Sequence, residues 1–155
     1  MANQHRYPVI VSWDPGDQGP VVNYAGYSRA WVAEREGKPD ISGSADPTYR
    51  GDAADWNPED LLVASLSACH MLTYLALAAS NKIEVHTYVD ECEGIMQVKD
   101  GRMRVTDLIL RPKIGLAAGA NLELAKDLHK PAHEQCFIAK SVTTEISVEP
   151  EFFYV

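Results

Sequence analysis

The chain has 155 residues, of which 46% are apolar and 23% are charged, proportions that suit an ordinary globular protein with one sizeable core. Its net charge is −8 and it contains no run of Lys or Arg, which makes nucleic acid and anionic membranes poor partners. We therefore predict a single domain over residues 1–155 that binds neither nucleic acid nor membrane.

The first residues, MANQHRYPVIVSWDPG, contain no apolar run long enough for a signal peptide. The chain has three cysteines, and an odd number argues against the disulfide framework of a secreted protein. We therefore expect a cytoplasmic protein, in which a cysteine pair is more often catalytic or metal-binding than structural.

The first third of the chain is predicted to consist of strands and turns. Apolar and β-branched residues predict strands at 9–13 and 21–34, separated by a turn cluster of Gly, Pro and Asp, and a short strand around Ile41. Residues 34–40 are predicted to form a hairpin turn and residues 42–55 a loop.

The strongest helix prediction runs from Asn57 to about Ser80. Asn57 is a good N-cap, Pro58 suits the first helical position, and two acidic residues follow in the first turn, where the helix dipole favours negative charge. Residues 61–79 carry no charged side chain and are about long enough to cross a bilayer. Their Ser, Thr and His residues favour instead a helix buried within a folded protein.

The remainder is predicted to add a hairpin, a second helix and a last strand. Strand-like residues 83–98 and 103–116 flank Asp100-Gly101, a strong two-residue hairpin signal. Residues 120–134 are predicted to be a helix that Pro131 should end or kink, and residues 141–150 alternate as a final strand. This order predicts an α+β domain with two helices packed on antiparallel sheet.

The three cysteines differ in what could surround them. Free cysteine is among the most buried residue types, so a structural role is expected for Cys92, in a strand-like run. Cys69 lies deep in the first predicted helix and Cys136 follows the second. Those two could form a redox pair, in which a nearby Arg favours the thiolate and a second thiol resolves the sulfenic acid.

A metal site is an alternative use of the same region. His129, His133 and Cys136 stand at i, i+4 and i+7, and Cys69 could complete a tetrahedral Cys2His2 zinc site. Pro131 interrupts the helix that would hold this spacing, so we favour solvent-exposed histidines over zinc ligands.

Two stretches resemble the OsmC/Ohr family of bacterial thiol peroxidases. They are NPEDLLVASLSACHMLTYL, beginning at Asn57, and HKPAHEQCFIAKSV, beginning at His129, and the resemblance extends over roughly residues 27–148. It implies an OsmC-like α+β fold, with antiparallel sheets wrapped around two central helices in an intertwined homodimer. It also implies reduction of organic hydroperoxides, and more weakly of hydrogen peroxide, without a cofactor or a metal.

By position, the resemblance assigns Cys69 as the peroxidatic thiol, Cys136 as the resolving thiol and Glu59 as the assisting carboxylate. The assisting arginine is Arg50 if the OsmC branch is followed and Arg29 if the Ohr branch is followed, and we favour Arg50. Such an enzyme takes an organic hydroperoxide as substrate and a dithiol, lipoyl-type or another small thiol, as reductant. The family often has proline after the second cysteine, whereas this chain has phenylalanine.

The spacing of Glu59 and Cys69 has a consequence of its own. Ten residues of a continuous helix rise roughly 15 Å, so the two side chains of one chain cannot touch. The spacing therefore predicts a site shared by two chains, or one in which an arginine spans the gap. His70 points about 100° away from Cys69 around the helix, which predicts a packing or hydrogen-bonding role. A non-enzymatic dimeric ligand-binding protein of the same fold remains an alternative to a peroxidase.

Overall fold

The computed structural model describes residues 4–155. Residues 1–3, which belong to the predicted single domain and to the segment tested for a signal peptide, lie outside the described residues. The chain divides into two compact units, of which the first ends at Leu61 and the second begins at Leu62. The single domain over residues 1–155 stays a prediction.

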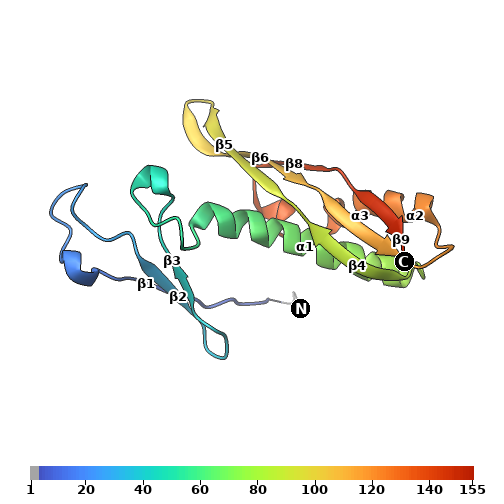
Figure 1. The fold of residues 1–155 in the computed structure, drawn as a ribbon, viewed down its shortest axis with the longest axis horizontal. Coiled ribbons are helices and arrows are strands. Elements are labelled where there is room, and N and C mark those ends of the chain that lie inside the picture. The colour runs from blue at the N-terminus through green and yellow to red at the C-terminus, as the bar shows by residue number, and fades with distance from the viewer. Residues whose placement is uncertain (1–3) are drawn as a thin grey trace. The chain divides into compact units, whose positions relative to one another are not determined.

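The first unit is built on a three-stranded antiparallel sheet in the order β1-β2-β3, drawn in blue in Figure 1. Its strands are β1 (Ile10–Trp13), β2 (Trp31–Glu34) and β3 (Ile41–Gly43), and its short 3-10 helices are η1 (Gly16–Gln18) and η2 (Pro47–Tyr49). The predicted strand at 21–34 is wrong over its first ten residues. Asn23 forms a turn there, because its side chain accepts a hydrogen bond from the backbone of Ala25 at 3.0 Å.

The first unit has almost no core of its own. Within residues 4–61 only Gly43 and Ser44 are buried, and every residue of β1 is exposed. Large apolar side chains such as Ile10 and Val11 are about two-thirds exposed, at 68% and 66%. Burial of apolar surface is the main term that offsets the entropy lost on folding, so this sheet requires another surface to cover it.

The long helix α1 (Pro58–Ser80) matches the predicted helix at both ends. Asn57 caps it, since its side-chain oxygen accepts a hydrogen bond from the backbone N–H of Asp60 at 2.8 Å. At the other end, the Asn81 amide donates to the carbonyl of Leu77, and Lys82 follows in the left-handed region. Local signals alone therefore define where this helix begins and ends.

The second unit contains two three-stranded sheets beside α1 (Figure 1). One sheet has the order β4-β7-β9, with β4 (Val85–Asp90), β7 (Pro112–Leu116) and β9 (Glu151–Tyr154). The other has the order β5-β6-β8, with β5 (Glu93–Lys99), β6 (Arg102–Leu110) and β8 (Glu145–Val148). The predicted turn between β5 and β6 is confirmed: Asp100 and Gly101 both have positive φ, as a two-residue hairpin requires.

The last two strands add parallel pairs to the predicted antiparallel sheet. β8 pairs with β6 and β9 pairs with β7, both in parallel. A parallel partner needs a crossover connection, and the chain supplies it with the helical segment between β7 and β8. The predicted last strand is thus β8 alone, and β9 was not predicted.

The predicted second helix consists of two short helices, α2 (Leu122–Asp127) and α3 (His129–Gln135), followed by the 3-10 helix η3 (Ala139–Ser141). Proline has no N–H to bond the carbonyl four residues earlier, which for Pro131 is the carbonyl of Asp127. α2 ends at that residue, and Pro131 is accommodated in the first turn of α3. The predicted effect of this proline is therefore confirmed.

The core of the second unit lies between α1, the sheets and the α2–α3 pair. One cluster joins Tyr74 and Ala78 of α1 to strand β7 and to both short helices, and a second joins Leu66 of α1 to β6. The remaining face of α1 is a row of small or apolar residues that is exposed, namely Ala64, Ser65, Ala68, Leu72 and Ala76. Among residues 4–155, α1 alone is long and apolar enough to span a membrane, a test that the core helix of a soluble protein also passes.

Candidate active site

Two thiols meet where α1 packs beside the end of α3. Cys69 is half-buried on α1, and Cys136 is the residue that directly follows α3 and is 1% exposed. The Cys136 thiol donates a hydrogen bond to the Sγ of Cys69 across 2.9 Å. The structure therefore brings together the two cysteines of the predicted pair, although 67 positions separate them in the chain.

The surroundings of Cys136 favour the protonated form of its thiol. Burial raises the pKa of the Cys136 thiol, and the hydrogen bond to Cys69 raises it further. A weaker opposing effect comes from the backbone N–H of Ala139, which donates to the Cys136 Sγ at 3.5 Å. Cys136 is thus the protonated donor, and Cys69 is the sulfur that accepts.

Cys69 also opens onto a cavity of about 860 Å³ on the surface of the second unit. Leu72 and Phe137, which are 63% and 83% exposed, line this cavity together with small residues of α1. Glu134 and Lys140 supply its charged groups. A reactant with an apolar body can therefore reach Cys69, whereas Cys136 is not among the lining residues.

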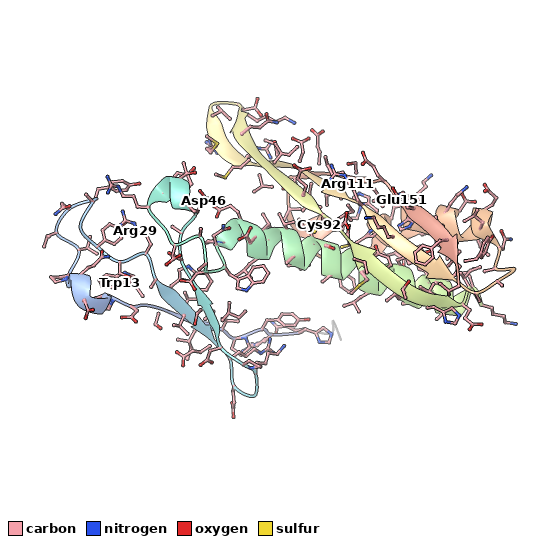
Figure 2. The ribbon with its side chains drawn as sticks, viewed as in Figure 1. Trp13, Arg29, Asp46, Cys92, Arg111 and Glu151 are labelled. Atoms are coloured by element: carbon pink, nitrogen blue, oxygen red, sulfur yellow. The ribbon has the colours of Figure 1, made fainter. Side chains whose placement is uncertain are left out.

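Arg29 lies in the first unit, near Trp13 and Asp46 (Figure 2). Its guanidinium donates hydrogen bonds to the carbonyls of Tyr27 and Tyr24, each at 2.5 Å. The same guanidinium lies over the ring of Tyr27, 3.5 Å from the centroid. These contacts fix the position of the charge without neutralising it.

Glu59 and Arg29 line one cavity of about 360 Å³ in the first unit. Arg50, the other candidate for the assisting arginine, lines a neighbouring cavity. Arg29 also lines that cavity, but Glu59 does not. Within residues 4–155, no ion pair joins Glu59 to either arginine. This geometry favours Arg29 as the partner of Glu59, whereas the sequence favoured Arg50.

The histidines differ from both sequence interpretations. His129 was expected on a solvated face, and this is wrong, since it is 6% exposed and stacks on Tyr74 at a centroid distance of 4.3 Å. Its Nδ1 atom lies 3.0 Å from the Nε2 atom of His70, which confirms the hydrogen-bonding role predicted for His70. Within residues 4–155, no three His, Cys, Asp or Glu side chains are grouped as a metal site, so the ligands of the alternative zinc site are not assembled.

No local pattern could predict that His70 contacts His129, because 59 positions separate the two residues. The i, i+4 spacing of His70 and Tyr74 predicts only that these two residues share one face of α1.

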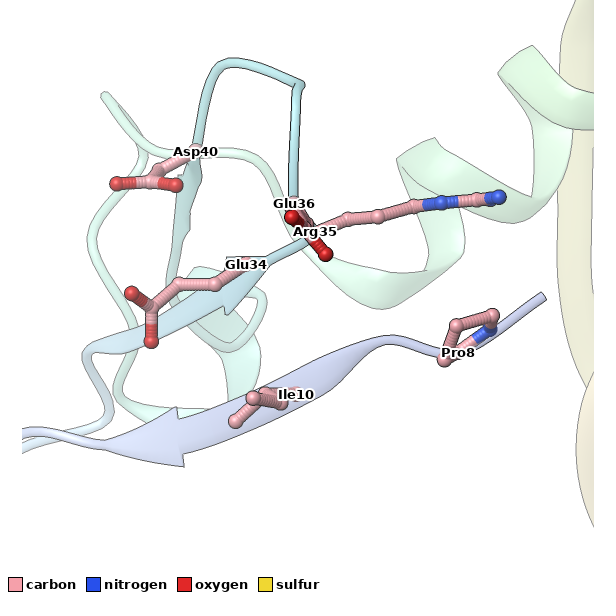
Figure 3. A pocket seen from close by; sticks show the side chains of 6 residues that line it. All are labelled: Pro8, Ile10, Glu34, Arg35, Glu36 and Asp40. Carbon is pink, nitrogen blue, oxygen red and sulfur yellow. The ribbon is translucent and has the colours of Figure 1, made fainter.

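Two other features stand apart from these groups. Cys92 lies between β4 and β5 (Figure 2) and packs against the cluster that contains Leu66, as expected for a structural cysteine. A cavity of about 630 Å³ lies beside β1 and β2 in the first unit (Figure 3). Its lining residues include none of the predicted site residues: Pro8, Ile10, Glu34, Arg35, Glu36 and Asp40.

Comparisons with known proteins agree with this architecture. Residues 51–151 match the family described as OsmC-like protein. An OsmC-like protein of unknown function from Vibrio cholerae is 33% identical, with 97% of this chain and 100% of that chain covered and a TM-score of 0.82. The uncharacterized protein YmaD of Bacillus subtilis is 26% identical over 104 residues, which cover 65% of this chain and 69% of YmaD.

The fold is shared with proteins that are named for hydroperoxide resistance. The organic hydroperoxide resistance protein OhrB of Bacillus subtilis has a TM-score of 0.59 at 21% identity, with 95% of this chain and 98% of that chain covered. At that identity the likeness concerns the fold alone. The family match over residues 51–151 and the identity to the Vibrio cholerae protein establish that the chain belongs to the OsmC-like protein family.

Proposed function

We propose that the chain is a thiol-dependent peroxidase that reduces organic hydroperoxides, and hydrogen peroxide more weakly, with Cys69 and Cys136 as its redox pair. The observation that carries the proposal is the pair itself. One sulfur is half-buried beside an apolar cavity and accepts a hydrogen bond from a buried, protonated thiol 2.9 Å away. A peroxidatic thiol and a resolving thiol need this division of exposure and of protons.

The proposed chemistry has two steps, with Cys69 reacting as the thiolate and Cys136 as the thiol. The Cys69 thiolate attacks the distal oxygen of the hydroperoxide, the O–O bond breaks, and the proximal oxygen takes a proton and leaves as an alcohol. Cys69 is then a sulfenic acid. The Cys136 sulfur attacks the Cys69 sulfur, the S–O bond breaks, and the hydroxyl group leaves as water with the Cys136 proton, which leaves a disulfide.

Regeneration requires two electrons from outside the chain. A small dithiol, lipoyl-type or similar, attacks the disulfide through a mixed disulfide and leaves oxidised, with both cysteines reduced. Cys69 is half-buried and Cys136 is buried, so the reductant reaches the disulfide at the sulfur of Cys69. A cytoplasmic location would supply the reducing conditions for this step.

The polar helpers are assigned to the first unit. Arg29 is held by two backbone carbonyls and keeps donors for a peroxide oxygen or a thiolate, and Glu59 lines the same cavity. We assign Arg29 the role of polarising the peroxide and Glu59 that of orienting the arginine, with Arg50 as the alternative arginine.

A homodimer is part of the proposal. The first unit buries only Gly43 and Ser44 within residues 4–61, and α1 exposes a row of small or apolar residues. A second copy with twofold symmetry would cover both surfaces. It would also allow Glu59 of one chain to serve Cys69 of the other, as the sequence spacing predicts.

The two alternative functions lose support. A dimeric ligand-binding protein would be favoured by a Cys69 buried away from any cavity, whereas Cys69 lines one. A zinc module would need its four ligands assembled, and residues 4–155 contain no such group.

Consumption of cumene hydroperoxide in the presence of dithiothreitol tests the proposal. Wild-type protein should consume the peroxide catalytically, and Cys69→Ser should reduce the rate to that of dithiothreitol alone. Wild-type activity in Cys69→Ser would end the peroxidase proposal.

A further inference from the structure

A buried polar contact joins α1 to the α2–α3 pair. His70 is 2% exposed and His129 is 6% exposed, and their rings are nearly parallel, with an interplanar angle of 5° and centroids 5.3 Å apart. Tyr74, one turn after His70, stacks on His129 and donates its hydroxyl to the carbonyl of Ala125 in α2 at 3.1 Å. We call His70, Tyr74 and His129 the histidine clamp.

The clamp depends on one hydrogen bond between two neutral rings. Burial lowers the pKa of both histidines to about 4, so near neutral pH one ring donates its proton and the other accepts. The Nε2 atom of His129 is buried and has no hydrogen-bond partner within residues 4–155. The bond to His70 is therefore the polar contact that orients the His129 ring, and its loss would leave a second buried nitrogen unpaired.

The clamp and the thiols share the same two helices. His70 directly follows Cys69 on α1, His129 is the first residue of α3, and Cys136 directly follows the last residue of α3. α3 has seven residues, so the position of its first residue largely fixes where Cys136 lies. Held at His129, α3 keeps the Cys136 sulfur 2.9 Å from that of Cys69.

We infer that His70 and His129 are positioning residues, which hold Cys136 within reach of Cys69 and so raise the effective concentration of one thiol toward the other. A fixed geometry makes the second, intramolecular step of disulfide formation far more favourable than it is between free thiols. The inference deepens the proposed function, since a resolving thiol must meet the sulfenic acid before a second peroxide does.

The test is the equilibrium between the Cys69–Cys136 disulfide and glutathione. One oxidised glutathione takes two electrons and two protons from the two thiols, which gives the protein disulfide and two reduced glutathione molecules. His70→Leu keeps similar volume and removes the hydrogen bond. We expect the equilibrium constant for its disulfide to fall at least about tenfold, which is about 30 mV for this two-electron couple.

Three further variants separate positioning from general stability. His70→Gln places an amide near the former Nε2 atom and should restore the constant to within about threefold of wild type. His129→Phe keeps the stack on Tyr74 without the hydrogen bond, so it should repeat the loss and replaces His70→Leu if that variant does not fold. Ser67→Ala is the matched control, since Ser67 lies on α1 but bonds Asp90 of β4, at 2.5 Å.

The inference is overturned if the hydrogen-bond-deficient variants keep the wild-type constant, or if Ser67→Ala loses as much as they do. Glutathione is the oxidant, so the measurement reports on the clamp even in a protein that consumes no hydroperoxide. Failure of the clamp and failure of the proposed peroxidase activity are therefore separate results.

Discussion

Cys136 donates its thiol proton toward Cys69 across 2.9 Å, and it does so from a position that is 1% exposed. The donor is buried and the acceptor lines a cavity. The two thiols therefore differ in burial before any peroxide arrives, and this difference supports the proposal that Cys69 attacks and Cys136 resolves.

Cys136→Ser should change what happens to Cys69 after its oxidation, and should leave the reaction of Cys69 with the peroxide unchanged. Without a resolving thiol, Cys69 reacts about once and stops as a sulfenic acid, or is over-oxidised by excess peroxide. Mass spectrometry of the intact protein after one equivalent of cumene hydroperoxide should show the added oxygen. Cys92→Ser is the matched control and should turn over like wild type. Wild type should instead lose two hydrogens as its disulfide forms, and a stable added oxygen on wild type would contradict the resolving role.

Acid should destabilise the fold through the histidine pair. In the folded protein, burial lowers the pKa of both His70 and His129 from 6.5 to about 4. Between these pH values the unfolded chain therefore binds protons that the folded chain does not bind. The contribution of the neutral pair to the free energy of unfolding is complete above pH 6.5 and is lost as the pH falls toward about 4. Each histidine can contribute a slope of up to about 1.4 kcal/mol per pH unit.

Urea unfolding at a series of pH values between 7 and 4 measures this slope. Asp90 and His133 also act on His70, the first raising and the second lowering its pKa, so the comparison must be with a variant. The slope should be smaller in His129→Phe than in wild type. Equal slopes would show that the acid sensitivity comes from other groups.

Arg29→Ala should cost more activity than Arg50→Ala. Arg29 shares a cavity with Glu59 and is fixed by two carbonyls, whereas Arg50 lies in the neighbouring cavity. Loss of one preorganised donor to a developing charge typically lowers the rate by about 10²–10³. kcat/KM for cumene hydroperoxide should therefore fall by that order in Arg29→Ala and by much less in Arg50→Ala. The reverse order would restore the assignment that the sequence favoured.

Mixing two inactive chains tests whether the site is shared. Glu59→Ala and Cys69→Ser chains should each be nearly inactive alone. Co-folded, their heterodimer should regain one site, in which Glu59 of one chain serves Cys69 of the other. A mixture that associates and stays inactive would show that Glu59 acts within its own chain or not at all.

The converse mixture is the control. A heterodimer of wild type with the double variant Glu59→Ala, Cys69→Ser should be inactive if the site is shared, because no Cys69 then meets a Glu59 from the other chain. One working site in that heterodimer would point to sites within single chains.

The sequence predicted correctly those helices and turns whose ends are determined by a few neighbouring residues. Asn57 and Pro58 begin α1, Asp100-Gly101 makes the β5–β6 turn, and Pro131 divides the second helix. The strand predicted at 21–34 failed at its start because apolar content outweighed the turn at Asn23. The parallel pairs of β8 and β9 are contacts between distant segments, which no local pattern encodes.

Some residues of the candidate site could likewise be predicted from the sequence, and others could not. The resemblance to OsmC/Ohr proteins indicated Cys69 and Cys136, which the structure brings together. The burial of His129 and its bond to His70 depend on the packing of α3 against α1, so periodicity alone placed that histidine on the wrong face. The preference for Arg29 over Arg50 rests on the cavity that Arg29 shares with Glu59, which no local pattern encodes.

The most direct test of the central claim is the identity of the bond that peroxide creates. Fully reduced protein is treated with one equivalent of cumene hydroperoxide, free thiols are blocked, and the protein is digested without reduction for peptide mass mapping. A Cys69–Cys136 disulfide within one chain is predicted, with Cys92 recovered as a blocked free thiol. Both Cys69 and Cys136 recovered as free thiols, or a disulfide that joins Cys92 instead, would contradict the account.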